Sequence, residues 1–244
     1  MRFLGPHACE EALERGDLQT LRIAPGAWER CAGLRQAARE RGVVVHREPL
    51  ESLDRRCPGS RHQGVLGEGE AIALAGLEAL LERVRAQGDR ALVLVLDGVS
   101  DPHNFGAILR SAAAAGVDGV IYPERRSAQL NETVVRASAG TAGRVPLVRV
   151  VNLGRALAQL QEAGAWVYGL DSQAGSRDYL DEPFERATVL VLGSEGEGLH
   201  QKIREHCDGL LRIEMPGGIE SLNVSSAAAV VLFRVLAQRR AHQG

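Results

Sequence analysis

The sequence predicts an α/β protein in which a small N-terminal α/β unit precedes a larger domain built on a doubly wound parallel sheet. From residue 91 onward, apolar strand patterns alternate with helical patterns, which is typical of a parallel sheet covered by helices on both faces. The first of these strands, residues 91–96, is a continuous apolar run, as expected for a strand buried on both faces.

The first seventy residues contain short elements of both kinds, and we expect them to form a domain of their own. Their helical patterns are each followed by a glycine, and their extended segments are short and rich in branched side chains. The predicted helices span 6–15 and 27–41, and the predicted strands span 18–23, 43–45 and 64–67.

Residues 71–88 predict an isolated helix rich in alanine, leucine and glutamate, and this segment is expected to link domain 1–70 to domain 89–244. Beyond it the strand and helix patterns alternate to the end of the chain. The strands are expected at 91–96, 119–122, 145–150, 166–170, 188–192 and 210–213, and the helices at 104–115, 129–139, 153–163, 199–206 and 224–240.

Composition narrows the class of protein. The formal net charge of −2 argues against an indiscriminate nucleic-acid coat, although 28 of the 29 basic residues are arginines, whose planar fork suits phosphate. The four cysteines are scattered and form no C-x-x-C pair, so a zinc or redox site is not expected. No apolar run is long enough to span a membrane and no signal peptide is evident. A cytoplasmic protein without a membrane or DNA partner is therefore expected.

Ligands of open parallel sheets bind beyond the carboxyl ends of the strands, and three loops there have unusual composition. The first, residues 97–106, leads into the helix that carries Arg110. Either Asp101 or Asn104 can cap that helix. An arginine near the start of a helix can hold a phosphate, but the alternative, an ordinary capped turn beside a solvated arginine, stays open for this loop alone.

The second loop is rich in glycine, with Gly193, Gly196 and Gly198 around two glutamates, Glu195 and Glu197. Its order, G-x-x-G-x-G, is the reverse of the dinucleotide fingerprint, and the chain has neither a Walker A motif nor a G-x-S-x-G motif. Two carboxylates favour a cofactor with a positively charged centre over a phosphate. The alternative is a glycine-rich turn with solvent-facing acids.

The third loop, residues 213–226, opens the C-terminal helix. Pro216-Gly217-Gly218 forbids regular structure, and then Ser221, Asn223 and Ser225 place three hydrogen-bonding side chains around the helix start. One of them is expected to be the N-cap. A cap does not need all three, so the loop is expected to do more than end a turn.

Together the three loops resemble the three motifs of the SpoU family of RNA ribose methyltransferases, within the SPOUT superfamily. The matching segments are 104–112, 192–199 and 213–225. Flanking segments are similar to those of family members that methylate a guanosine of bacterial 23S rRNA. They lie at 97–104, 126–131, 146–150 and 204–208, and in the first domain at 5–8 and 61–64, so the resemblance covers nearly the whole chain.

The resemblance implies a C-terminal domain with a deep trefoil knot, an L30e-like RNA-binding first domain, a homodimer, and S-adenosylmethionine as the cofactor. By the same resemblance, the cofactor pocket is formed by Gly193, Gly198, Ile213, Met215, Gly217 and Leu222. The substrate it implies is the P-loop guanosine of 23S rRNA.

Catalytic roles also follow from the resemblance. The family's chemistry gives Arg110 the central position, and because a guanidinium stays protonated in proteins, we expect it to clamp the neighbouring phosphate. Orientation of Arg110, ribose and methyl donor is then assigned to Asn104, Glu195, Ser221 and Asn223. No metal is expected, because sulfonium methyl transfer does not need one.

Two alternatives remain at this point. The chain could be a tRNA ribose methyltransferase of the same family, although the full first domain favours rRNA. It could instead be a non-catalytic RNA-binding or ribosome-assembly protein with a degenerate pocket, against which the intact motif residues speak. A nucleotide-dependent oxidoreductase lacks its glycine fingerprint.

Overall fold

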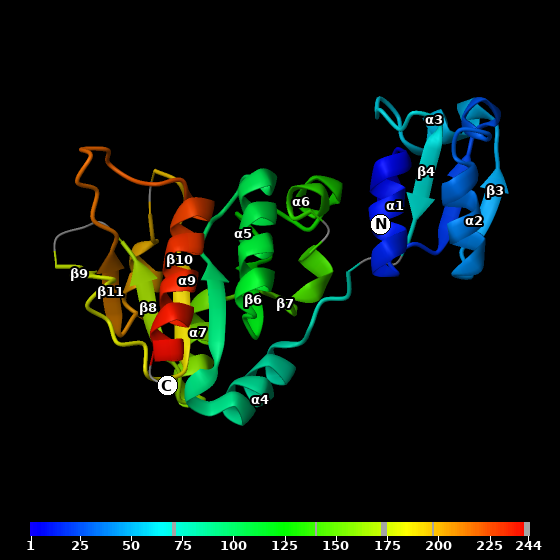
Figure 1. The fold of residues 1–244 in the computed structure, drawn as a ribbon. Helices are drawn as coiled ribbons and strands as arrows, with labels where there is room; N and C mark the ends of the chain where they lie inside the picture. Colours follow the sequence, from blue (N-terminus) through cyan, green and yellow to red (C-terminus); the bar gives the residue numbers. More distant parts are fainter. Residues whose placement is uncertain (70–71, 140, 172–174, 197, 242–244) are drawn as a thin grey trace. The chain divides into compact units, whose positions relative to one another are not determined.

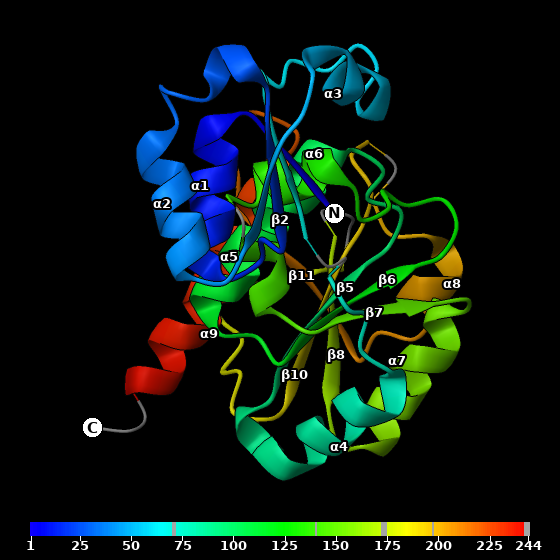
Figure 2. The same cartoon turned by 90° about the vertical axis from the view of Figure 1, so that its right-hand side faces the viewer.

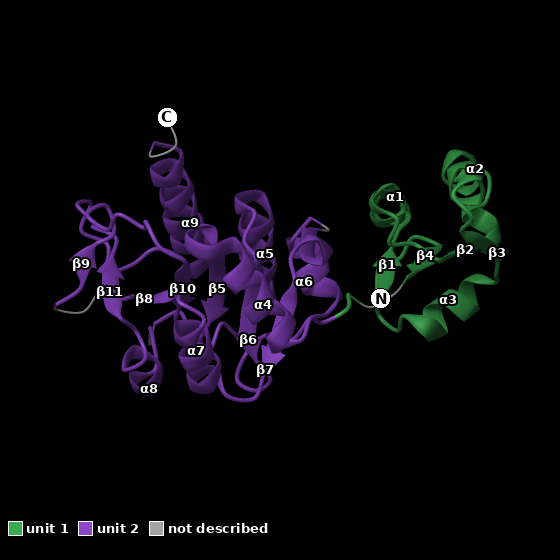
Figure 3. Cartoon of the chain, turned by 90° about the horizontal axis from the view of Figure 1, so that it is seen from below, with its two compact units in different colours: residues 1–73 green, residues 74–244 purple. Residues whose placement is uncertain are grey.

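The structure, a computed structural model, describes residues 1–69, 72–139, 141–171, 175–196 and 198–241 (Figure 1). Its contacts divide the chain into two compact units, Met1–Ala73 and Leu74–Gly244 (Figure 3).

The first unit is a four-stranded sheet with helices. The strand order is β1-β4-β2-β3, with β2 and β3 parallel and β4 antiparallel to both β1 and β2. Its elements are β1 (Arg2–Leu4), α1 (Pro6–Arg15), β2 (Thr20–Ile23), a 3₁₀ turn η1 (Pro25–Ala27), α2 (Ala32–Glu40), β3 (Val44–Arg47), α3 (Leu50–Arg56) and β4 (Val65–Glu68).

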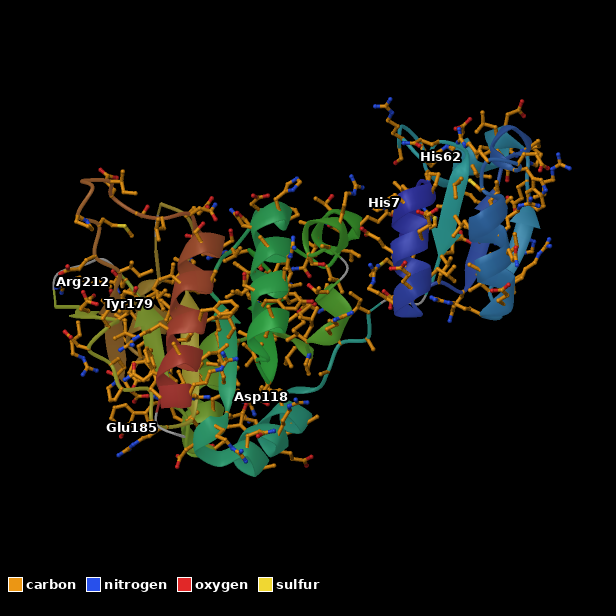
Figure 4. All side chains as sticks on the ribbon, viewed as in Figure 1. His7, His62, Asp118, Tyr179, Glu185 and Arg212 are labelled. Carbon is orange, nitrogen blue, oxygen red and sulfur yellow. The ribbon has the colours of Figure 1, made fainter. Side chains whose placement is uncertain are left out.

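A buried histidine fixes the entry to β4 in this unit. His62 is 5% exposed (labelled in Figure 4). Its Nδ1 accepts a hydrogen bond from the Gly64 amide at 3.1 Å, which leaves the proton on Nε2 to donate to Asp54 Oδ1 at 2.9 Å. The ring is therefore a satisfied structural group.

The predicted helix over 27–41 is wrong at its beginning. The chain makes the turn η1 (Pro25–Ala27) and a further irregular turn before α2 begins at Ala32. The spacing of apolar residues cannot distinguish a series of tight turns from an α-helix, because both place residues three or four positions apart on one buried face. Two short elements, β1 and α3, have too few residues to show a period and were not predicted.

The second unit is a seven-stranded sheet in the described residues, and every strand pair in it is parallel, with the order β7-β6-β5-β10-β8-β11-β9. Its strands are β5 (Leu92–Leu96), β6 (Gly119–Pro123), β7 (Leu147–Val150), β8 (Trp166–Leu170), β9 (Arg177–Asp178), β10 (Thr188–Leu192) and β11 (Gly209–Arg212). Its helices are α4 (Leu77–Gln87), α5 (Pro102–Ala115), α6 (Glu132–Ala137), α7 (Leu153–Glu162), α8 (Gln201–Arg204) and α9 (Val224–Ala241), with 3₁₀ turns η2 (Gly88–Arg90) and η3 (Thr141–Arg144).

The central strands of this sheet are covered on both faces. Every residue of β5 and β10 is buried. Alternate strand residues such as Val93 and Val189 join Leu157 of α7 and Ile203 of α8 in one apolar cluster. On the opposite face α5 packs along α9 (Figures 1 and 2). The α/β fold with a parallel sheet, expected from the continuous apolar runs, is confirmed.

The segment predicted as a linker, 71–88, differs from the prediction where it is described. Its helix α4 buries Leu80, Leu81 and Val84 in the apolar cluster of the second unit. Arg83 of α4 is also fixed, since its Nε lies 2.9 Å from Oδ1 of Asp118. Asp118 is labelled in Figure 4. The helix is amphipathic and belongs to the sheet domain, because its leucines have a surface to cover. No helix of the described residues is both long and apolar enough to cross a membrane.

Candidate active site

The carboxyl ends of β8, β10 and β11 open onto a cavity of about 420 Å³. These strands are neighbours in the sheet, so the loops that follow them meet at one edge. The lining comes from the ends of the three strands, from the glycine-rich loop and from the segment before α9: Leu170, Asp171, Leu192, Gly193, Ser194, Glu195, Gly196, Gly198, Leu211, Arg212, Ile213, Met215, Glu220, Ser221, Leu222, Asn223, Val224 and Ala227.

The glycine-rich loop closes on itself as a tight hairpin. The amide of Ser194 donates to the carbonyl of Gly198 at 3.0 Å, and the amide of Gly198 returns a bond to Ser194 at 3.1 Å. A Cβ placed on Gly193 would lie 2.1 Å from the carbonyl carbon of Gly198. Because real Cβ contacts do not approach that closely, this close backbone approach is possible only with glycine at 193.

Asn223 connects the three predicted motifs. Its amide nitrogen donates to Asn104 Oδ1 at 2.9 Å and to Glu195 Oε1 at 2.6 Å. The same carboxylate oxygen of Glu195 lies 3.5 Å from the amide of Val224, at the beginning of α9. One side chain from each loop therefore meets at the wall of the cavity.

The helix caps explain why Asn104 is available for this cluster. Asp101 caps α5, since its side chain accepts from the His103 amide at 3.0 Å. Asn223 precedes α9 and its Oδ1 accepts from the Ser225 amide at 2.9 Å, so the expectation that one of the three polar residues is the N-cap is confirmed. Because Asp101 satisfies the start of α5, the buried side chain of Asn104 is free to accept from Asn223.

Most of the predicted site residues meet at this cavity. Glu195, Ser221 and Asn223 line it, and Asn104 contacts it through Asn223. Of the residues predicted to hold the cofactor, Gly193, Gly198, Ile213, Met215 and Leu222 line the cavity, whereas Gly217 is exposed and not part of the lining. Glu197 lies outside the described residues.

Arg110 is placed differently. It follows Asn104 by six positions on α5, which is about 9 Å along the helix and roughly 120° around it. Its side chain is exposed and, among the described residues, has no hydrogen bond or ion pair with Asn104, Glu195, Ser221 or Asn223. The cluster therefore orients itself without Arg110 within one chain.

Two carboxylates at the ends of strands were not predicted as site residues. Asp171 follows β8, lines the cavity and pairs with Arg204 at 2.6 Å. Asp97 follows β5 and accepts from the amide of His200 at 2.8 Å, while the imidazole Nδ1 lies 3.0 Å from its other oxygen. The signal was present in both cases, since an aspartate directly follows an apolar strand.

One arginine lines the cavity, and a cysteine precedes β11 in the same unit. Arg212, labelled in Figure 4, ends β11, and its carbonyl accepts from the Tyr179 amide at 3.0 Å. Burial raises the pKa of the Cys207 thiol to about 12, and the carboxylates of Asp208, Asp97 and Asp171 add to that rise. Cys207 is therefore not a nucleophile near neutral pH. Among the described residues no group of three His, Cys, Asp or Glu side chains is placed to hold a metal ion.

We expect Asn223→Asp to lower the melting temperature by about 2–4 °C, equivalent to roughly 1 kcal/mol in a domain of this size. The substitution replaces the amide donor of Asn223 with a carboxylate. In the unmodified protein that amide nitrogen lies 2.6 Å from the Glu195 carboxylate, so the variant places two carboxylates side by side. The loss should shrink as the pH falls, because protonation of one carboxyl restores a donor. Scanning calorimetry measures the shift.

The matched control for that variant is Glu195→Gln in the same chain. The glutamine amide can donate to the new carboxylate, so most of the stability should return in the double variant. Equal melting temperatures for Asn223→Asp with and without Glu195→Gln would show that the contact contributes nothing.

The parallel sheet, the glycine-framed cavity at its carboxyl edge and the three-loop cluster define a cofactor-binding α/β enzyme domain. Residues 91–233 match the SpoU rRNA Methylase family. This chain belongs to that family.

The similarity to known proteins extends beyond residues 91–233. A protein of Xylella fastidiosa (strain 9a5c), the 23S rRNA (guanosine-2′-O-)-methyltransferase RlmB, is 45% identical over 96% of this chain and 90% of its own length. The protein of the same name from Escherichia coli (strain K12) is 41% identical over 96% of this chain and 97% of its own. Among solved structures, the SpoU methyltransferase AviRb from Streptomyces viridochromogenes, in complex with AdoMet, superposes with a TM-score of 0.74 at 26% identity and covers 99% of this chain and 91% of that one.

Proposed function

We propose that this protein transfers a methyl group from S-adenosylmethionine to the ribose 2′-oxygen of a guanosine in 23S rRNA, the P-loop guanosine. The observation that carries the proposal is the Asn104–Asn223–Glu195 cluster on the wall of a glycine-framed cavity. Two relatives are named for the same reaction. They are 45% and 41% identical to this protein over 96% of its chain.

The cavity fits a bent S-adenosylmethionine. Its volume of about 420 Å³ and the close backbone approach at Gly193 leave room for a small organic cofactor against main-chain groups. The carboxylate of Glu195 on the wall suits a positively charged sulfonium. Gly193, Gly198, Ile213, Met215 and Leu222 would hold the cofactor, which supplies the electrophilic methyl group when bound.

The residues of the chain then have three tasks. Leu222 and the loop before α9 position the donor side, and the cluster around Asn223 places the ribose so that its 2′-oxygen lies in line, at roughly 3–3.5 Å from the methyl carbon. Arg110 holds the adjacent phosphate through its two-pronged guanidinium. The 2′-hydroxyl would lose its proton, with help from the clamped phosphate, as its oxygen bonds to the methyl carbon. The carbon–sulfur bond of the donor would break in the same step, and S-adenosylhomocysteine would be the leaving group.

Arg110 also supports the homodimer that we propose. Arg110 is outside the lining of the cavity within one chain, and a site formed beside a second copy would give it a place next to a cavity. A self-association face is available on α9, which packs along α5 and leaves Phe233 49% and Val230 37% exposed. Aromatic and branched side chains on an exposed helix face are typical of such interfaces.

Three further features belong to this proposal. The second unit is proposed to contain a deep trefoil knot, which the placement of β10 between β5 and β8 supports. The first unit is proposed to be an L30e-like RNA-binding domain. A protein that acts on rRNA is proposed to work in the cytoplasm, on RNA and not on DNA or membranes.

A tRNA ribose methyltransferase is the second candidate. The Aquifex aeolicus TrmH/SpoU tRNA modifying enzyme is 30% identical with a TM-score of 0.58, but it aligns with 68% of this chain. The rRNA relative from Xylella fastidiosa matches 96% of this chain, so the match includes most of the first unit, residues 1–73. This favours rRNA over tRNA as the substrate.

The test is methyl transfer by the purified protein with radiolabelled S-adenosylmethionine. We expect label on the ribose of one guanosine in unmodified 23S rRNA and none on 16S rRNA or tRNA. Calorimetry should give one S-adenosylmethionine site per chain. Label on tRNA alone would replace the substrate, and failure to bind the cofactor would leave only a non-catalytic RNA-binding protein.

A further inference from the structure

A second cavity, of about 470 Å³, lies at the carboxyl ends of β5, β6 and β7. It is lined by the loops after these three strands and by the segment around α8, all within the second unit. The lining contains three basic side chains, Arg125, Arg126 and Lys202, together with the imidazoles of His200 and His206.

This cavity borders the first one. Strand β5 is the neighbour of β10, so the two cavities occupy adjacent halves of one sheet edge. At the border the backbone of Gly98 approaches closely, since a Cβ there would be 3.5 Å from Cβ of Ser194 and 3.2 Å from the ring of His200. The buried carboxylate of Asp97 holds His200 through both its amide and its ring. The wall shared by the cavities is therefore fixed.

The charge of the lining is positive. Asp97 is the sole carboxylate among the lining residues, and it is already bonded to His200. Within the described part of the chain, none of Arg125, Arg126 and Lys202 has an ion-pair partner, and all three are exposed. Exposed cations without partners in a concave site attract anions, because the field is focused there.

The beginning of α7 adds to this preference. Asn152 caps the helix through the Arg155 amide at 3.0 Å, and the first turn contains no acidic residue. The amino end of a ten-residue helix thus faces the lining with its positive dipole uncompensated. The ring of His206 packs against this end, 2.7 Å from where a Cβ of Gly154 would lie.

We propose that this second cavity binds backbone phosphates of the substrate RNA that flank the methylated ribose. The inference rests on the proposed function, because the first cavity presents the ribose site from which the strand continues. A single strand leaving that site along the sheet edge meets Arg125, Arg126 and Lys202 next. The first cavity places the methyl group, and the second holds the strand in register.

The chain offers a direct reporter. Lys202 is the sole lysine of the 244 residues, so amine acylation followed by mass spectrometry reads this cavity without activity. We expect a 23S rRNA fragment containing the target to protect Lys202 from acylation at least about fivefold, at concentrations about tenfold above its dissociation constant, where the protein is nearly saturated. Inorganic phosphate at the same phosphate concentration should not protect it. Protection by inorganic phosphate but not by RNA would assign the cavity to a small free anion and overturn the proposal.

The second measurement is RNA affinity of Arg125→Ala/Lys202→Ala. We expect its dissociation constant to rise about tenfold at 0.1 M salt, and the slope of log K against log salt to fall by roughly 0.7 for each phosphate that the variant no longer neutralises. Affinity for S-adenosylmethionine should not change, because neither residue lines the first cavity.

The matched control is Arg85→Ala/Arg90→Ala. It also removes two positive charges, but near the C-terminal end of α4, before β5. RNA affinity and salt slope equal to those of this control would overturn the proposal. The outcomes separate the two inferences. If the protein methylates 23S rRNA and substitution of Arg125 and Lys202 changes nothing, RNA binding in the second cavity is refuted and the proposed reaction stands. If RNA protects Lys202 but no methyl transfer occurs, the proposed reaction alone is refuted.

Discussion

Arg110→Lys is expected to lower kcat for methyl transfer by at least about 100-fold, the usual cost of removing one positioned hydrogen-bond donor from a transition state. Lysine keeps the charge but has no planar fork, so it cannot hold two phosphate oxygens at once. Arg110 is exposed and has no hydrogen bond or ion pair among the described residues. The fold therefore does not depend on it, and the loss should appear in kcat and not in stability.

Single-turnover methyl transfer at saturating RNA is the measurement for this variant. The melting temperature and the dissociation constant of S-adenosylmethionine serve as controls, since an exposed surface substitution changes the free energy of unfolding by less than about 0.5 kcal/mol. Near-normal transfer by Arg110→Lys would contradict the role of clamp and leave Arg110 as a simple counter-charge.

Gly193→Ala is expected to weaken binding of S-adenosylmethionine by at least about 100-fold, because the loss of a fitted backbone surface removes several interactions at once. The added methyl would be 2.1 Å from the carbonyl carbon of Gly198 and 2.2 Å from its oxygen, so the hairpin has to open. Overpacking of this kind also destabilises a protein by about 1–3 kcal/mol. Calorimetric titration with the cofactor measures the first effect and thermal unfolding the second.

Gly76→Ala is the control for that variant. Gly76 precedes α4 in the same unit, its φ is −76°, and a Cβ there meets nothing within 4 Å. It should bind S-adenosylmethionine normally. If Gly193→Ala binds it as tightly as Gly76→Ala does, the hairpin does not frame the cofactor.

Most elements of the second unit could be predicted from the sequence, because strands such as β5 and β10 are continuous apolar runs and helices such as α7 have the spacing of an amphipathic helix. The two-residue strand β9 was not predicted, because it is too short to show a pattern. The order of the strands could not be predicted. Strand β10 lies between β5 and β8, which are distant in sequence, and no local pattern encodes that pairing. The helix α4 was misjudged as a connector, because its apolar side acquires meaning only when the sheet face that it covers is known.

Part of the candidate site could also be predicted from the sequence, and part depends on the fold. Glycines, carboxylates and amides at the ends of strands pointed to the correct three loops, and the caps at Asp101 and Asn223 follow from local preferences. The bond between Asn104 and Asn223 joins residues 119 positions apart, so only the folded chain reveals it. Separation of Arg110 from this cluster is also a property of the fold, because six residues along a helix turn a side chain to another face.

The most direct test of the central claim is a map of ribose 2′-O-methyl groups in the rRNA and tRNA of a strain that lacks this protein. We expect the loss of one mark, on a guanosine of 23S rRNA, its return with the unmodified gene and its continued absence with Arg110→Lys. A complete set of marks in the deletion strain, or a missing mark in tRNA instead, would contradict it.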